Sequence, residues 1–189
     1  FRKSMGADAE LNLGTNATLL DAGIRSELAD SGLSGLGFSM DGATASTYEA
    51  IRIGASFKKV VENITAMTEL SATRQTKIHF WCNFVVQPEN ISECVQFVEL
   101  CDKMGVKDCR FSLIQDYASD GKIPDYSALF GKDIGRDDGI HFYNTTRQQT
   151  MERALQLGIS CSFDTIPSLP EEKRACDDTL AKSEDNKKE

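Results

Sequence analysis

The chain has 189 residues, 40% of them hydrophobic, which suits one domain with a buried core. Its 29 acidic residues outnumber its 21 Lys and Arg residues and give a formal net charge of −8. This charge argues against a nucleic acid partner, which needs a basic surface. No apolar stretch approaches the ~18 residues needed to cross a bilayer, so we expect no membrane partner either.

The pattern of apolar residues alternates between short strands and longer amphipathic helices. A helix over 19–30 is expected to bury Leu20, Ile24 and Leu28, which recur every four residues. Before another helix, Asn90 and Glu93 have the spacing of a capping box. The expected strands are 9–14, 33–39, 77–86, 106–114 and 159–163, and the expected helices are 19–30, 46–51, one that starts after Ser56, 90–104 and 145–157.

Two polar stretches interrupt or follow this pattern. Residues 115–138 contain three glycines and no sustained periodicity, which is typical of a functional loop such as a lid or of poor order. Residues 171–189 are mostly charged, with both signs mixed, as in a solvated tail. We therefore divide the chain into a domain over 1–166 and a charged tail over 167–189.

Parallel strands that are each reached through a helix predict an α/β fold. A closed eight-stranded barrel needs about 250 residues, more than this chain has. We therefore expect a partial TIM-like barrel, with parallel strands and the helices on the outside.

The cysteines give no sign of a local metal site. None of the six forms a Cys-x-x-Cys pair, and Cys94 and Cys101 fall on the apolar stripe of an expected helix, as small buried side chains do. Nothing indicates a secreted disulfide-rich scaffold, so we expect a reducing, cytoplasmic location. The cysteines are Cys82, Cys94, Cys101, Cys109, Cys161 and Cys176.

Ligands of such folds bind at the carboxyl ends of the strands, where this sequence places small polar residues. Simpler interpretations also stand: Thr15 and Asn16 cap the next helix, Asp41-Gly42 forms a turn, and Arg52 pairs with a surface carboxylate. A Gly-rich phosphate loop is missing, so ribose hydroxyls suit these residues better than phosphate does. The candidates are Thr15, Asn16, Ser39, Asp41, Arg52, Asn83, Ser112 and Gln115.

An ordered series of motifs resembles the second half of a radical S-adenosylmethionine (SAM) domain. The series begins with LGTNATLL at 13–20, GFSMDG at 37–42 and YEAIRIGASF at 48–57. Asn63-Ile64, Val85-Val86, Asn90 and Met104-Gly105-Val106 continue it in order. The resemblance extends to the SPASM-type group related to anaerobic sulfatase maturases. It implies a partial (βα)6 barrel, of which this chain holds about the last four or five βα units.

In that family a [4Fe-4S] cluster reduces S-adenosyl-L-methionine to a 5′-deoxyadenosyl radical, which abstracts a hydrogen from the substrate. By resemblance, Ser39 and Asp41 contact the ribose, Arg52 holds the methionine carboxylate, and Thr15 and Asn16 line the site. The resemblance leaves the catalytic residues unassigned, and implies a small-molecule or peptide substrate and a reductant such as flavodoxin or ferredoxin.

The sequence departs from the family in lacking the Cys-x3-Cys-x2-Cys cluster loop and the GGEP-like motif. We expect both to belong upstream of Phe1, which makes this chain a fragment, inactive on its own, whose cluster ligands lie elsewhere. The residues around Cys176 do not match an auxiliary-cluster extension. The rival hypothesis is a non-catalytic module that binds a nucleoside-like ligand or a protein. The hypothesis of a lyase or aldolase ranks last, because such an enzyme needs a Lys at the carboxyl end of a strand and no Lys falls there.

Overall fold

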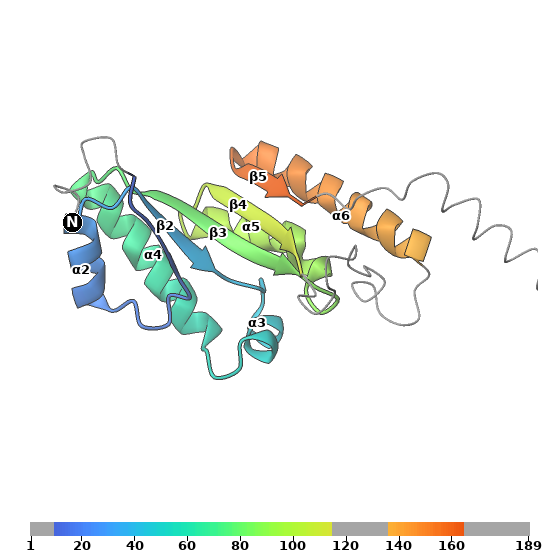
Figure 1. The fold of residues 1–189 in the computed structure, drawn as a ribbon, viewed down its shortest axis with the longest axis horizontal. Coiled ribbons are helices and arrows are strands. Elements are labelled where there is room, and N and C mark those ends of the chain that lie inside the picture. Colours follow the sequence, from blue (N-terminus) through green and yellow to red (C-terminus); the bar gives the residue numbers. More distant parts are fainter. Residues whose placement is uncertain (1–9, 115–135, 165–189) are drawn as a thin grey trace, which may run out of the picture.

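The computed structural model describes residues 10–114 and 136–164, and these contain one parallel five-stranded sheet. Its strands follow the chain in the order β1-β2-β3-β4-β5 (Figure 1). A doubly wound sheet reverses its strand order at a switch point, whereas this order runs in one direction, as in a (βα) barrel. The predicted α/β fold with parallel strands is confirmed. The strands are β1 (Asn12–Thr15), β2 (Gly35–Ser39), β3 (His79–Val86), β4 (Asp108–Leu113) and β5 (Ser160–Phe163).

Helices connect every pair of neighbouring strands. Two helices, α3 and α4, lie between β2 and β3, and each other connection has a single α-helix among its described residues. The elements are α2 (Ala22–Asp30), α3 (Ala45–Ile51), α4 (Phe57–Arg74), the 3-10 turn η1 (Ile91–Glu93), α5 (Cys94–Lys103) and α6 (Arg136–Leu157).

The hydrophobic core lies between the helices and one face of the sheet. Along β3, every second side chain is buried, namely Cys82, Phe84 and Val86. The ring of Phe84 packs 4.6 Å from that of Phe97 on α5. Cys94 and Cys101 are fully buried and their thiols are free, as the apolar stripe predicted.

The opposite face of the sheet carries Trp81 and polar side chains. Gly37 is the register partner of Trp81, and a Cβ atom added at Gly37 would lie 2.6 Å from Cζ2 of the indole. Only a glycine therefore leaves room for the Trp81 ring to lie on β2. The Arg110 guanidinium lies 4.6 Å from the centre of the Trp81 ring, which adds a cation–π contact.

Three local predictions were wrong. Helix α2 starts at Ala22 behind an Asp21 cap and buries none of its residues; Ile24 is 40% exposed, and the buried Leu20 precedes the helix. Helix α6 begins at Arg136 rather than at 145, so part of the expected polar stretch is helical. Asn90 and Glu93 do not form a capping box. Residues 115–135 and the tail after 164 lie outside the described residues.

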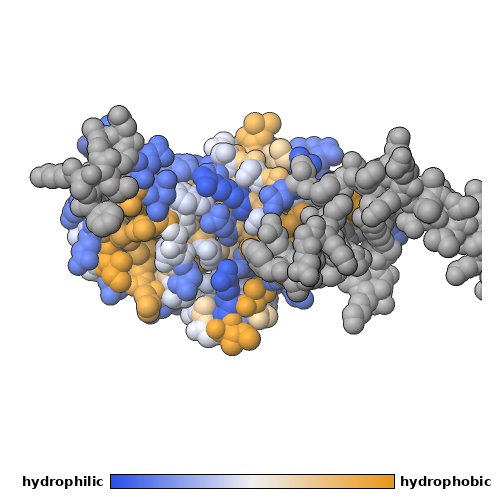
Figure 2. Space-filling view, in the orientation of Figure 1, coloured by the Kyte–Doolittle hydropathy of each residue, from blue (hydrophilic) through white to orange (hydrophobic). Residues whose placement is uncertain are grey.

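The surface of the described residues is hydrophilic with separate apolar patches. Figure 2 shows several such patches, one of them at the position of α3. Among the large apolar residues between β1 and α4, Ile53 after α3 and Leu19 before α2 are the most exposed, with 91% and 77% of their surface accessible. Both lie at the cavity described next.

Candidate functional site

Asp41, just beyond the end of β2, is a buried carboxylate that holds Arg52. Its side chain is 5% exposed, and its Oδ1 accepts a hydrogen bond from the backbone N–H of Val85 at 2.9 Å. Its Oδ2 accepts from Nε of Arg52 at 2.7 Å and from Nη2 of Arg52 at 2.5 Å. Both oxygens are thus occupied within the protein, whereas the Arg52 side chain remains 37% exposed. Asp41 therefore orients Arg52, and Arg52 is the group that a ligand can reach.

The sequence around Arg52 fixes its place by local capping. Thr44 caps the N-terminus of α3 by accepting a hydrogen bond from the N–H of Thr47, and the N–H of Arg52 closes the helix on the carbonyl of Tyr48. The chain then turns at Gly54, whose φ of 85° is a left-handed conformation that favours glycine. Ser56 caps α4 by accepting from the N–H of Lys59 at 3.4 Å. The Arg52 side chain thus extends from a short, defined connection.

Asn90 joins the ends of β2 and β3, a role that its local sequence pattern did not indicate. Its Nδ2 donates to the carbonyls of Asp41 at 3.1 Å and Val85 at 2.8 Å. Its Oδ1 accepts from the N–H of Gln87 at 2.9 Å. This fully buried amide therefore supports the backbone on both sides of Asp41.

Glu93 holds the start of α3 from the other side. Its Oε2 accepts from the N–H groups of Ala43 and Thr44 at 2.7 and 3.2 Å. Its Oε1 accepts from the hydroxyls of Thr44 and Thr47 at 2.7 and 2.6 Å. Burial alone raises the pKa of Glu93, but these four hydrogen bonds outweigh it, so the pKa is lowered from its ordinary value of 4.5. Glu93 therefore stays ionised at the positive end of α3.

The loop between β1 and α2 forms one wall of the site. Ala17 has a φ of 58°, and the turn is closed by Thr15 Oγ1, which accepts from the N–H of Ala17 at 3.1 Å. Asn16 Oδ1 accepts from the N–H and the hydroxyl of Thr18 at 3.2 and 2.8 Å. Asn63 of α4 donates to the carbonyl of Ala17 at 2.8 Å and attaches the loop to the helix.

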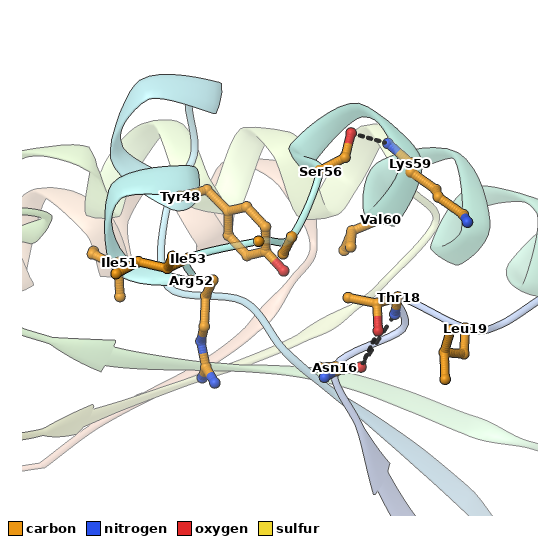
Figure 3. A pocket seen from close by; sticks show the side chains of 12 residues that line it. Asn16, Thr18, Leu19, Tyr48, Ile51, Arg52, Ile53, Ser56, Lys59 and Val60 are labelled. Atoms are coloured by element: carbon orange, nitrogen blue, oxygen red, sulfur yellow. Dashed lines mark hydrogen bonds between the residues drawn. The ribbon is translucent and has the colours of Figure 1, made fainter.

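A cavity of about 670 Å³ opens between this loop, α3 and the start of α4 (Figure 3). Among the described residues that line it, the charged ones are Arg52 and Lys59, both cations, and none is a carboxylate. The rest is apolar or small. The described residues that line it are Asn16, Thr18, Leu19, Tyr48, Ile51, Arg52, Ile53, Gly54, Ala55, Ser56, Lys59 and Val60.

Tyr48 is one of the lining residues that sequence reasoning missed. It is fully buried, and its hydroxyl has no hydrogen-bond partner among the described residues. Burial raises the pKa of Tyr48, the Arg52 cation lowers it and the Asp41 carboxylate raises it, with a net increase. The phenol is therefore protonated at neutral pH and is a donor. No local sequence signal distinguishes Tyr48 from an ordinary core aromatic residue.

The structure brings together some of the residues predicted for the site. Asn16 and Arg52 line the cavity, and Asp41 lies behind Arg52. The register aligns Thr15 with Phe38 and Ser39 with Asn83, so Thr15 and Ser39 point to opposite faces of the sheet.

Two of the simpler interpretations do not hold. Asp21 rather than Thr15 or Asn16 caps α2. The partner of Arg52 is the buried Asp41 rather than a surface carboxylate. Of the other candidates, Ser112 lies on β4 and is half-buried, and residue 115 lies outside the described residues.

The described residues also bear on metals and membranes. Within 10–114 and 136–164, no group of three or more His, Cys, Asp or Glu side chains is arranged to hold a metal ion. No helix in the same part of the chain is both long and apolar enough to cross a membrane.

Comparisons with known proteins show similarity at the level of the fold. No protein-family model and no curated protein matches the chain. SuiB of Streptococcus suis, solved bound to S-adenosylmethionine, superposes with a TM-score of 0.58 at 10% identity, over 82% of this chain and 32% of SuiB. SuiB bound to the precursor peptide SuiA gives 0.57 at 11% identity, over 82% and 31%. This chain thus spans about a third of the length of SuiB.

The chain is also similar to a solved structure with a different description. A putative sugar phosphate isomerase/epimerase of Anabaena variabilis gives a TM-score of 0.50 at 12% identity, over 85% of this chain and 55% of that protein. The similarity to both proteins is one of fold and agrees with the predicted partial barrel.

Proposed function

We propose that this chain is the C-terminal part of a radical SAM core domain. In this proposal it holds S-adenosylmethionine at the carboxyl ends of the strands, beside the cavity that Arg52 lines. The observation that carries this proposal is Arg52, whose guanidinium is held by Asp41 and whose partly exposed side chain lines the cavity. An arginine prepared in this way suits a carboxylate, which the methionine part of the cofactor carries. The fold similarity to SuiB in its SAM-bound structure supports the same assignment.

The described residues suit S-adenosylmethionine but not the [4Fe-4S] cluster, the two groups that the family resemblance implies. The cavity offers the partly exposed Arg52 to the carboxylate end of SAM. The described residues supply no ligand set for a [4Fe-4S] cluster. In this proposal the cluster, which supplies the electron that cleaves SAM, is therefore held by residues outside the described ones. We expect no 5′-deoxyadenosine from the chain alone with a chemical reductant.

SAM binding to the chain, measured by isothermal titration calorimetry, tests the proposal. Arg52→Ala should weaken binding about tenfold or more, because it removes a hydrogen-bonded charge contact. Arg74→Ala is the matched control, since Arg74 pairs with Asp30 on the surface and does not line the cavity. If SAM does not bind, or if Arg52→Ala binds it as the original chain does, the assignment is wrong. Equal affinity for adenosine and SAM would instead favour the rival nucleoside-binding module.

A further inference from the structure

The face of the sheet that carries Trp81, here called the open face, differs from the inside of an ordinary (βα) barrel. Bulky branched side chains usually fill that space as a packed core. On the open face, β1 and β2 contribute mainly glycines and β5 contributes serines. Val85 is the single branched aliphatic residue among the described strand positions of this face. The open face therefore suits a polar ligand better than a packed apolar layer.

A row of polar side chains crosses four strands of the open face. The register aligns Asn83 of β3 with Ser39 of β2 and with Arg110 of β4. Arg110 is in turn aligned with Ser162 of β5. The side chains of Asn83 and of the two serines make no hydrogen bond with another described residue. The row thus presents amide and hydroxyl groups, which both donate and accept, beside one guanidinium.

Arg110 is the charged member of the row, and its neighbours hold it in place. Its Nε and Nη2 donate to Oδ2 of Asp108 at 3.1 and 2.7 Å, and its guanidinium lies over the Trp81 ring. Nε2 of His79 lies 2.9 Å from the same Asp108 oxygen. The Asp108 side chain is 11% exposed, whereas that of Arg110 is 46% exposed. A ligand can therefore reach the cation, while the carboxylate that neutralises it is largely covered.

The ligand that suits this row is a polar carboxylate. Nη1 of Arg110 makes no hydrogen bond with a described residue, and a guanidinium binds carboxylates through two parallel N–H bonds. Arg110 and Asp108 together carry no net charge, so a singly charged carboxylate suits them better than phosphate. The row also lacks the free helix N–H groups that phosphate prefers, because its residues belong to strands. The flanking amide and hydroxyl groups favour hydroxyl groups on the ligand.

We infer that the open face binds a small hydroxy acid. Its carboxylate pairs with Arg110, and its hydroxyl groups bond to the neighbouring Asn83 and Ser162. The site includes neither Arg52 nor the cavity that Arg52 lines, so binding of the acid does not depend on SAM. The inference also names a substrate class for the proposed function, and only this role as substrate rests on that function.

The test titrates the full 189-residue chain, labelled with nitrogen-15, with gluconate and follows the indole N–H resonance. Trp81 is the single tryptophan of the chain and contacts Arg110, so this resonance reports on the site. Gluconate should bind at least about tenfold more tightly than the uncharged gluconamide, because hydrogen bonds to charged groups contribute that much. Hexanoate, which has the charge but no hydroxyl groups, and inorganic phosphate should both bind more weakly than gluconate.

Three variants separate the site from general charge effects. Arg110→Gln should weaken gluconate binding about tenfold or more, because it removes the charged donor. Asn83→Ala should weaken gluconate binding several-fold and leave hexanoate binding unchanged, because it removes an amide and no charge. Arg153→Gln is the matched control, since Arg153 is 38% exposed and pairs with Glu99 but lies on α6, and it should leave binding unchanged. The urea midpoint of each variant separates loss of binding from loss of the fold.

The outcomes distinguish this inference from the proposed function. Gluconate binding that persists in a chain saturated with SAM supports both the site and its role as a substrate site. Gluconate binding by a chain that does not bind SAM supports the site and contradicts the proposed function. Displacement of gluconate by SAM overturns the separate site. Equal binding of gluconate and gluconamide, tighter binding of hexanoate or phosphate, or unchanged binding by a folded Arg110→Gln variant overturns it as well, whatever SAM does.

Discussion

Replacing Asp41 by alanine is expected to destabilise the fold as well as the site. The substitution removes the acceptor of the Val85 N–H and the partner of Arg52 at once. Val85 belongs to β3, so its N–H loses its partner at the carboxyl edge of the sheet. Arg52 loses the contact that orients it toward the cavity.

The magnitude follows from burial. Leaving the Val85 N–H unsatisfied costs about 1–3 kcal/mol. Breaking a buried ion pair costs about 3–5 kcal/mol, but the Arg52 side chain is 37% exposed and regains hydrogen bonds to water. We therefore place the loss at about 3 kcal/mol, at the lower end of the range for buried pairs.

Urea unfolding followed by circular dichroism measures this loss. Asp30→Ala is the matched control, because Asp30 also pairs with an arginine, Arg74, but its side chain is 70% exposed. Such a surface pair contributes about 0–1 kcal/mol. Equal losses in the two variants would refute the reasoning that Asp41 is a buried structural anchor.

The remaining predictions concern the open face of the sheet and the start of α3. Gly37→Ala should cost about 1–3 kcal/mol by overpacking against the Trp81 ring, whereas Gly14→Ala, its register partner with nothing within 4 Å of the added Cβ, should cost much less. The chain has a single tryptophan, so a fluorescence change in the Gly37 variant alone would confirm displacement of the indole, and identical urea midpoints and spectra would contradict it. Glu93→Gln should cost about 1.5–3 kcal/mol at neutral pH, because it replaces an ionised acceptor of four hydrogen bonds. Because the folded-state pKa of Glu93 is lowered, its stabilisation is complete above pH 4.5, the ordinary pKa, and is lost as the pH falls through the folded-state pKa. The difference between the urea midpoints of the original chain and Glu93→Gln should therefore disappear in acid. A difference that stays constant with pH would argue against this role.

Part of the candidate site was predictable because its signals are local. Polar residues after strand ends marked Asn16, and the position of Arg52 at a helix end marked Arg52; both residues line the cavity. The same rule selected Asp41, but it could not show that both carboxylate oxygens are used inside the protein. Tyr48 carried no signal, because a buried aromatic residue and a residue with an unpartnered hydroxyl look the same in a sequence.

The sequence by itself determined the order of the strands and helices, the parallel α/β architecture and the Ser56 cap of α4. These features depend on hydrophobic periodicity and on side chains within a few residues of the backbone groups that they satisfy. Only the tertiary structure decided the partners of Asn90 and Glu93, which had the spacing of a local capping box. Their hydrogen bonds instead reach Asp41 and Thr44, each 49 residues away, because packing of the sheet brought the end of β2 beside the turn before α5. A buried polar side chain takes the partner that the fold presents, and no local pattern specifies that partner.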